Sequence, residues 1–292
     1  MVRQWWRSRF GGNLVRELVL VVALLAVYKY GRFLGKGHVE TALHNARDVI
    51  GLERSLGVFS EARLQDLVLG NRSVVWFLNV YYLVAHVAVT AAAFVWLYAR
   101  HPQGYRRFRN VMIAITLAGM FVHLVLPLAP PRMFPRLGFV DTAKVVGPAS
   151  YGAGSPYKGF ANQFAAMPSL HFGWALVIAW AVIVAAGIHS RWRYLVILHP
   201  VLTLAAIVLT ANHYWLDAVV ATILFGLALV VDHLLERQRK RRQVRAVGAG
   251  TAALEQRTAR SSPDSPSTFR PATPRAPVAA SAADSPPARC QG

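Results

Sequence analysis

Long apolar runs alternate with short polar or basic stretches over most of the chain. Each run is close to the length of about 20 residues that a helix needs to cross a bilayer. The runs lack the alternating polarity of a barrel strand, and backbone groups in lipid must form their hydrogen bonds within one segment or within a closed barrel. We therefore expect each run to be a helix. The six predicted membrane spans are residues 15–34, 74–99, 110–128, 172–188, 194–211 and 217–235.

The first span has the basic flank of a secretory signal peptide, because Arg3, Arg7 and Arg9 precede it. A cleaved signal also needs a site of small residues after its apolar core. No such site follows this run. We interpret it as a retained membrane helix.

The composition favours a polytopic membrane protein over a soluble domain. Of 292 residues, 55% are hydrophobic and 15% are charged. That is too apolar for an ordinary soluble domain, and the chain is too long for a single anchor. The one cysteine, Cys290, permits neither an intrachain disulfide nor a cysteine-based metal site. The predicted fold class is all-α, a six-transmembrane-helix bundle.

Residues 35–73 contain a further helical pattern that is too short and too charged to span. Apolar residues recur at partly helical spacing from Val49 to Phe59 and again at Leu64 and Leu67. This pattern predicts an amphipathic helix at the outer membrane interface, and it also fits a packing helix that caps the bundle.

The C-terminal region has a different composition. After Glu236 the chain is basic, and it then becomes rich in Pro, Ser and Ala, which predicts disorder from about residue 246 onward. The expected organisation is an N-terminal segment (1–14), a membrane domain (15–235) and a basic, then disordered, tail (236–292).

The formal net charge of +19 raises the question of nucleic-acid binding. Lys and Arg, however, cluster in the N-terminal segment, the short loops and the tail, and they do not interleave with aromatic residues on a soluble platform. Topology signals and contacts with lipid headgroups account for this distribution. We expect membrane lipids as partners and no nucleic acid.

Basic residues also predict the orientation. If six helices alternate, the N-terminus, residues 100–109, residues 191–193 and the tail share one side of the membrane. By the positive-inside rule both termini are cytoplasmic, and we expect the plasma (inner) membrane. The other side receives 35–73, 129–171 and 212–216. In 35–73 most of the basic charge is balanced by Glu40, Asp48, Glu53, Glu61 and Asp66.

Candidate chemistry lies at the predicted outer side. Ionisable groups near membrane depth are costly unless they face protein or water, so they mark functional sites by default. His171 begins the fourth span, His213 follows the fifth, Asp217 starts the sixth, and Arg132 follows the third. All four are expected at the same membrane face.

His213 and Asp217 are four residues apart, so they share a face if the sixth helix starts one turn early. A carboxylate bonded to one imidazole nitrogen fixes the tautomer and leaves the other nitrogen as a base or nucleophile. A structural contact that holds a helix hairpin together explains the same pair.

Pro168 and Ser169 precede an apolar run and predict a helix start, with Ser169 as its cap. The free amides and positive dipole of such a start suit a phosphate, and His171 is placed to donate a proton to a departing oxygen. Arg132, among prolines, offers a fixed fork for phosphate oxygens. Interfacial packing of His171 and snorkelling of Arg132 are the structural alternatives.

Two imidazoles and a carboxylate also form a possible three-ligand metal site. Arg132, Arg136, Lys144 and Lys158 in the preceding loop disfavour a cation and favour an anion. We therefore expect neither a metal nor another cofactor. The histidines within predicted spans have no acidic partner at helical spacing and are expected in core or helix-contact roles: His86, His123 and His199.

These residues carry a family resemblance. Pro168-Ser169-Leu170-His171 resembles the second signature of the type 2 phosphatidic acid phosphatase superfamily of six-helix membrane enzymes. His213 with Asp217 resembles the third, and Ala129-Pro130-Pro131-Arg132 the first. The similarity spans most of residues 35–235. The forms of these segments are most similar to the inositol phosphorylceramide synthase-like branch and its bacterial relatives.

The resemblance implies a mechanism. His213 would attack the phosphorus of a lipid phosphate, Asp217 would orient His213, and His171 would protonate the leaving group. Arg132 would hold phosphate oxygens throughout. Water or a second alcohol would then release the phosphohistidine, and no metal is required.

Two positions depart from the phosphatase pattern. Ala206-Ile207 stands where a Ser-Arg pair precedes the third-signature histidine, and Val125 stands where a lysine precedes the first-signature arginine. Both departures fit the synthase-like branch better. They imply that the phosphate finds other donors, such as Ser169, Asn212 or the backbone.

Two questions stay open at this level. Water as the second acceptor makes the protein a phosphatase, whereas an alcohol such as an inositol-type headgroup makes it a transferase. Outside the enzymes, a non-catalytic lipid-binding or transport protein would use the same cationic pocket. In each case the expected ligand is a lipid phosphate.

Overall fold

The structure is a computed structural model that describes residues 15–17, 19, 20, 22, 23, 26, 39–146, 163–187 and 191–261. Most of the predicted span 15–34 therefore lies outside the described residues. The chain divides into two compact units, 1–238 and 239–292. The site and its supporting contacts belong to the first unit.

The described residues form helices and contain no strand, which confirms the all-α prediction. A π-helical turn, Tyr81–Ala85, joins α4 and α5 into one continuous helical segment, and two 3₁₀ turns follow α6 at Pro131–Met133 and Pro135–Leu137. The α-helices are α2 (Val39–Ser55), α3 (Glu61–Leu69), α4 (Arg72–Val80), α5 (His86–Arg100), α6 (Pro102–Val125), α7 (Thr142–Val145), α8 (Leu170–Ala186), α9 (Trp192–Leu209) and α10 (Trp215–Ser261).

Three helical segments are long and apolar enough to cross a membrane: Arg72–Arg100, Pro102–Val125 and Trp215–Ala252. Two shorter apolar helices, Leu170–Ala186 and Tyr194–Leu209, complete the set in the described part of the chain. These five segments coincide with the second to sixth predicted spans. The count of six spans stays a prediction.

The helix ends differ from the predicted spans where polar residues extend a helix. α6 begins at Pro102, eight residues before its apolar run, because a proline is well placed in a first turn whose N–H groups have no partner. α10 continues through the basic segment to Ser261, so the predicted disorder from residue 246 is wrong as far as residue 261. Residues 246–261 contain no proline and several strong helix formers, and they extend an existing helix without a new nucleus.

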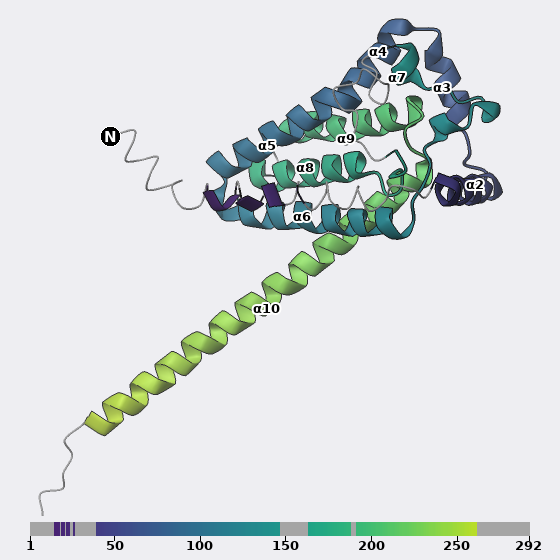
Figure 1. Ribbon diagram of the computed structural model, residues 1–292. Coiled ribbons are helices and arrows are strands. Elements are labelled where there is room, and N and C mark those ends of the chain that lie inside the picture. Colours follow the sequence, from purple (N-terminus) through teal and green to yellow (C-terminus); the bar gives the residue numbers. More distant parts are fainter. Residues whose placement is uncertain are drawn as a thin grey trace, which may run out of the picture. The chain divides into compact units, whose positions relative to one another are not determined.

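α8 is the central helix of the first unit. It packs against α5, α6 and α9, and Figure 1 shows these helices side by side. Its sequence is apolar on all faces, as a surrounded helix requires. Two glycines allow close approach: a Cβ on Gly173 would meet Ile115 Cδ1 at 2.8 Å, and one on Gly119 would meet Leu170 Cδ2 at 2.5 Å.

Short helices and loops close one end of this unit, where α8 and α10 begin (Figure 1). Ala129 N–H donates to Ala42 O at 3.0 Å, and Asn45 Nδ2 donates to Pro127 O at 2.8 Å. The buried face of α2 also packs on Ala166 and Tyr214. α2 thus packs on this end of the bundle, and its location at a membrane interface stays a prediction.

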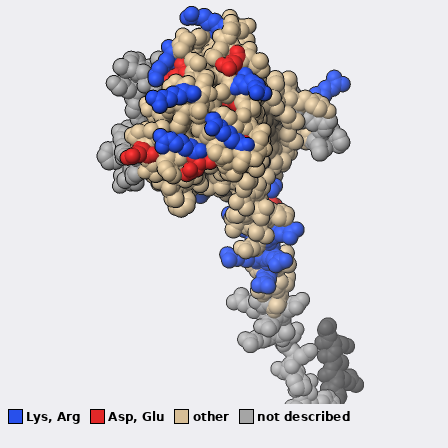
Figure 2. Space-filling view, turned by 90° about the vertical axis from the view of Figure 1, so that its right-hand side faces the viewer, with Lys and Arg blue, Asp and Glu red and all other residues tan. Residues whose placement is uncertain are grey.

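Figure 2 shows Lys and Arg side chains gathered on the surface of this end, with fewer acidic ones among them. Two of the five acidic residues expected to balance the charge, Glu53 and Glu61, are fully buried. They therefore do not offset the surface charge. The exposed basic residues on the elements at this end are Arg47, Arg54, Arg63, Arg72, Arg136 and Lys144.

We predict that Gly173→Leu destabilises the bundle. The new side chain must displace Ile115 from the contact between α6 and α8, and overpacking of this kind typically costs about 1–3 kcal/mol. The measurement is the thermal unfolding temperature of the purified protein in detergent. Gly226→Leu in α10 is the matched control, because a Cβ there meets no atom within 4 Å. Equal unfolding temperatures for the two variants would contradict this packing.

Candidate functional site

The three segments singled out by sequence meet through backbone hydrogen bonds. A parallel bridge joins Leu128 to Ala165, with Leu128 N–H donating to Phe164 O at 2.8 Å. Arg132 N–H donates to Ala211 O at 2.9 Å, which ties the first segment to the turn before α10. Segments that lie far apart in sequence thus form one rigid cluster.

His213 is held in a defined orientation inside this cluster. It is 4% exposed, and its Nδ1 lies 3.1 Å from Asp217 Oδ2 and 2.7 Å from Ala166 O. Because both neighbours are acceptors, Nδ1 carries a proton that it donates to them, and Nε2 has an available lone pair. The arrangement provides a nucleophile or a base.

The pair does not share a helix face, because the condition for that, a start of the sixth helix one turn early, is not met. α10 begins at Trp215, so His213 lies in the turn before it. Asp217 reaches back to this turn, where its Oδ2 also accepts the Tyr214 N–H at 2.9 Å. A capping interaction therefore brings the carboxylate to the imidazole.

The predicted start of α8 is confirmed. Leu170 is its first residue, and Ser169 Oγ accepts the Phe172 N–H at 3.4 Å. Ser169 is fully buried, and its backbone N–H donates to Asp217 O at 3.2 Å. The first turn of α8 thus begins beside Asp217.

His171 lies on that first turn, 6.3 Å from His213 between ring centroids. Its ring contacts Tyr82 at a centroid distance of 4.2 Å. His171 is only partly buried, whereas His213 is almost fully enclosed. One imidazole is therefore fixed by acceptors, and the second, beside it, is more accessible.

Arg132 completes the predicted set. It lies on the 3₁₀ turn Pro131–Met133, and its Nη1 donates to Asn212 Oδ1. Asn212 Nδ2 in turn donates to Thr210 Oγ1 at 2.6 Å, so the amide is fixed on both sides. The guanidinium is partly exposed, and it places a permanent positive charge next to the His213 turn.

The structure thus joins all six predicted site residues in one network of contacts. Within the described residues, no group of three or more His, Cys, Asp or Glu side chains is placed to hold a metal ion. The positive groups, Arg132 and the first amides of α8, suit an oxyanion.

Sequence reasoning missed a second row of polar residues behind His171. The His86 ring stacks on His199 at a centroid distance of 5.1 Å and lies tilted against His171 at 5.2 Å, and Tyr81 Oη lies 2.6 Å from His199 Nδ1. His86 and His199 do make helix contacts, as expected, but their link to His171 requires α5, α8 and α9 to pack together. The sequence signal that could have indicated this row was the presence of polar residues within apolar spans.

Sequence reasoning also missed Glu53 and Glu61, which are buried against the start of α10. Leu216 N–H donates to Glu53 at 2.9 Å, and Trp215 N–H donates to Glu61 at 3.2 Å. Helical spacing could have predicted the burial of Glu53, because this residue continues the buried stripe of Ala46 and Ile50 on α2.

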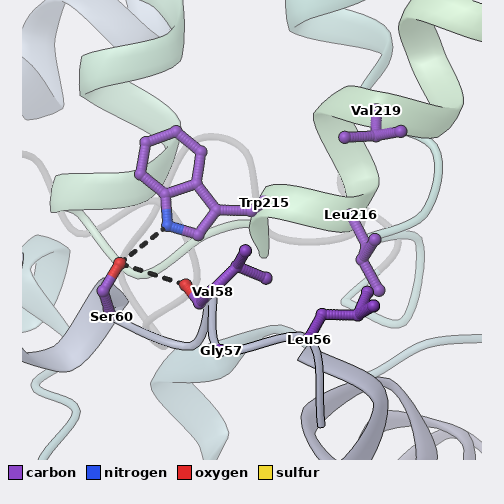
Figure 3. Close-up of a pocket in the computed structure, with 7 residues that line it drawn as sticks. All are labelled: Leu56, Gly57, Val58, Ser60, Trp215, Leu216 and Val219. Atoms are coloured by element: carbon purple, nitrogen blue, oxygen red, sulfur yellow. Dashed lines mark hydrogen bonds between the residues drawn. The ribbon is translucent and has the colours of Figure 1, made fainter. Parts of the chain in front are cut away.

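An apolar pocket of about 580 Å³ lies beside these contacts. Figure 3 shows the Trp215 indole above the turn that leads to Ser60. Trp215 Nε1–H donates to Ser60 Oγ at 3.2 Å, so the polar groups here are paired and the lining is largely apolar. The lining residues are Leu56, Gly57, Val58, Ser60, Trp215, Leu216 and Val219.

Comparison with known proteins identifies one family. The model described as the PAP2 superfamily matches residues 47–231, a range that contains every predicted site residue. No curated protein and no solved structure matches the chain.

We predict that Arg132→Gln weakens the binding of inorganic phosphate. A charged hydrogen bond contributes about 1.5–3 kcal/mol, so the loss should be at least about tenfold in affinity. The measurement is the rise in thermal unfolding temperature with phosphate concentration. Arg136→Gln, the same charge change at an exposed position in the same loop, is the control. An equal loss of affinity in both variants would show that Arg132 acts only through the net positive charge of the loop and not through a specific contact with phosphate.

Proposed function

The chain belongs to the PAP2 superfamily, and from this premise we propose that it is a membrane enzyme that cleaves the phosphate ester of a lipid through a phosphohistidine at His213. Family membership supports a phosphatase or phosphotransferase. The orientation of His213 carries the finer proposal, because Nδ1–H is held by Asp217 and Ala166 and Nε2 is left to react.

In the first step Nε2 of His213 attacks phosphorus and the bond from phosphorus to the leaving oxygen breaks. His171 gives its proton to that oxygen. Arg132 and the first amides of α8 hold the other phosphate oxygens, whose charge changes most during the transfer. Asp217 stabilises the positive charge that His213 gains.

In the second step an acceptor attacks the phosphohistidine, and the phosphorus–nitrogen bond breaks. Deprotonated His171 now takes the proton of the acceptor, so the enzyme returns to its first state. Water yields free phosphate, and an alcohol yields a new phosphate monoester. The synthase-like signatures favour an alcohol acceptor with an inositol-type headgroup.

The Ala206-Ile207 departure from the phosphatase pattern has a structural counterpart. Ala206 and Ile207 are fully buried, and Ile207 O accepts the backbone N–H groups of Asn212 and His213 at 3.0 and 3.1 Å. These positions therefore place the His213 turn and provide no side-chain donor. Arg132 and the α8 amides take that role.

A lipid substrate is supported by the surroundings of the site. The surface of this end is basic (Figure 2), which attracts anionic headgroups. An apolar pocket lies beside the first turn of α10 and suits hydrocarbon (Figure 3). We propose that the site opens to the outer face of the plasma membrane and that the lipid enters laterally.

We predict that the purified protein releases phosphate from a lipid phosphate, or transfers it to an added alcohol. His213→Asn should reduce turnover at least about 1,000-fold, because the nucleophile is lost. Product masses with and without inositol distinguish water from an alcohol as acceptor. Turnover should persist with a chelator of divalent cations.

The matched control for this test is His44→Asn. His44 has an aspartate four residues later, as His213 does, and its Nδ1 lies 3.2 Å from Asp48 Oδ2, but both side chains are exposed. Wild-type turnover in His44→Asn and none in His213→Asn supports the proposal. Lipid phosphate binding without turnover in the wild type would favour the lipid-binding alternative.

The proposed orientation predicts which cysteines react from outside the cell. Cys290, the one native cysteine, lies in the tail and should resist a membrane-impermeant maleimide until the cells are lysed. In a Cys290→Ser background, Ser55→Cys at the exposed end of α2 should react in intact cells. Labelling of Cys290 in intact cells would reverse the assignment of the two faces.

A further inference from the structure

Two buried glutamates converge on the first turn of α10 and have no role in the chemistry proposed above. Glu53 comes from α2 and Glu61 from α3, and both are fully buried. A carboxylate in such surroundings is costly unless it is bonded or protonated. Their presence beneath the catalytic turn therefore calls for a function.

Each glutamate accepts a backbone N–H at the start of α10. Leu216 N–H donates to Glu53 Oε1 at 2.9 Å, and Trp215 N–H donates to Glu61 Oε1 at 3.2 Å. The preceding N–H, that of Tyr214, donates to Asp217 Oδ2. Three consecutive N–H groups are thus bonded to three carboxyl groups, from α2, α3 and α10. N–H groups at a helix start have no partner within the helix, and the helix dipole is positive there, so this end of α10 stabilises negative charge.

The two carboxyl groups are neighbours, because they accept the consecutive backbone N–H groups of Trp215 and Leu216. Glu53 Oε2 is buried and has no hydrogen-bond partner in the described part of the chain. Two carboxyl groups bond to each other only when one holds a proton. Burial, and then the proximity of Glu61, raise the pKa of Glu53 to about 9, so Glu53 retains its proton at neutral pH.

We propose that Glu53 and Glu61 form a clamp, held closed by one shared proton, that positions the first turn of α10 and through it Asp217 and His213. Neither glutamate touches the substrate, so both are positioning residues. The expected effect of the clamp on turnover rests on the proposed function. Its expected effect on the stability of the fold rests on the contacts alone.

The groups that face the pair define its response to pH. Asp217 on α10 faces Glu53, and its negative charge opposes the ionisation of Glu53. The Tyr214 hydroxyl, which also lies near the two glutamates, is uncharged. No ion pair within the described residues involves either glutamate. Loss of the shared proton thus adds a negative charge next to Asp217, and no cationic side chain among the described residues pairs with it.

The sign of the stability change follows from the raised pKa. A carboxyl group whose pKa is higher in the folded state stabilises the fold fully below its unfolded pKa, and this contribution is lost as pH rises through the folded value. For Glu53 that window runs from 4.5 to about 9. The clamp should open at alkaline pH, and Asp217 should lose its orientation there.

The test compares Glu53→Ala with Glu53→Gln. Alanine removes the clamp and should reduce kcat about 10- to 100-fold with little change in KM. Glutamine keeps an acceptor for Leu216 N–H and donates to Glu61 without titrating, so it should recover most of the turnover that alanine loses. It should also retain activity at pH 9.5, where the wild type loses at least tenfold relative to pH 7. Glu40→Gln, an exposed change on the same helix, is the control.

A second readout separates the clamp from the proposed function. The thermal unfolding temperature, measured from pH 6 to 10, should fall more steeply for the wild type than for Glu53→Gln. The same alkaline loss of both activity and unfolding temperature in wild type and Glu53→Gln would overturn the clamp. If neither the wild type nor any variant turns over a lipid phosphate, the proposed function fails, and the unfolding profiles alone decide whether the clamp exists.

Discussion

The first turn of α10 is the constraint on which the site depends. Its consecutive backbone N–H groups are bonded to Asp217, Glu61 and Glu53, which come from α10, α3 and α2. Donors at a helix start must be paired when they are buried. Here their partners also join three elements, so that satisfying the backbone fixes the position of the Asp217 carboxylate. His213 is then oriented by the same Asp217 oxygen that accepts the Tyr214 N–H.

The rest of this end of the bundle is organised by the same requirement. Gln65 donates to Val140 O and Leu209 O and accepts from Val140 N–H. Asn79 bonds to Val146 O and to Thr142. Each buried side-chain amide thus forms hydrogen bonds with backbone groups that have no partner in a helix. Without these bonds the buried backbone groups would be unsatisfied and would destabilise the fold. The loops that carry Arg132 and His213 are therefore as well defined as the helices they connect.

The features that could be predicted from the sequence are those that depend on local residue patterns. Five of the spans, the Ser169 cap and the grouping of Arg132, His171 and His213 follow from apolar periodicity, capping residues and the order of segments. Spacing alone was insufficient, because His44 and Asp48 have the same separation as His213 and Asp217 and lie exposed. The burial of Glu53 and Glu61 could not be predicted from charge, since it depends on N–H donors more than 150 residues away in the chain. Likewise, the contact between the His86 and His171 rings exists only once α5 and α8 pack.

The arrangement of charges explains how three buried acidic groups coexist with a site suited to an anion. The carboxyl groups bond to the N–H donors of α10, and Glu53 and Glu61 together carry one negative charge when they share a proton. Arg132 bonds to Asn212, next to His213 in the chain, and the Asp217 carboxylate bonds to the His213 imidazole. Negative charge is thus paired with the N–H donors of α10, and Arg132 places positive charge beside the His213 turn. In the proposed clamp, loss of the shared proton adds a negative charge that would repel an anion bound beside Arg132, so the shared proton favours anion binding.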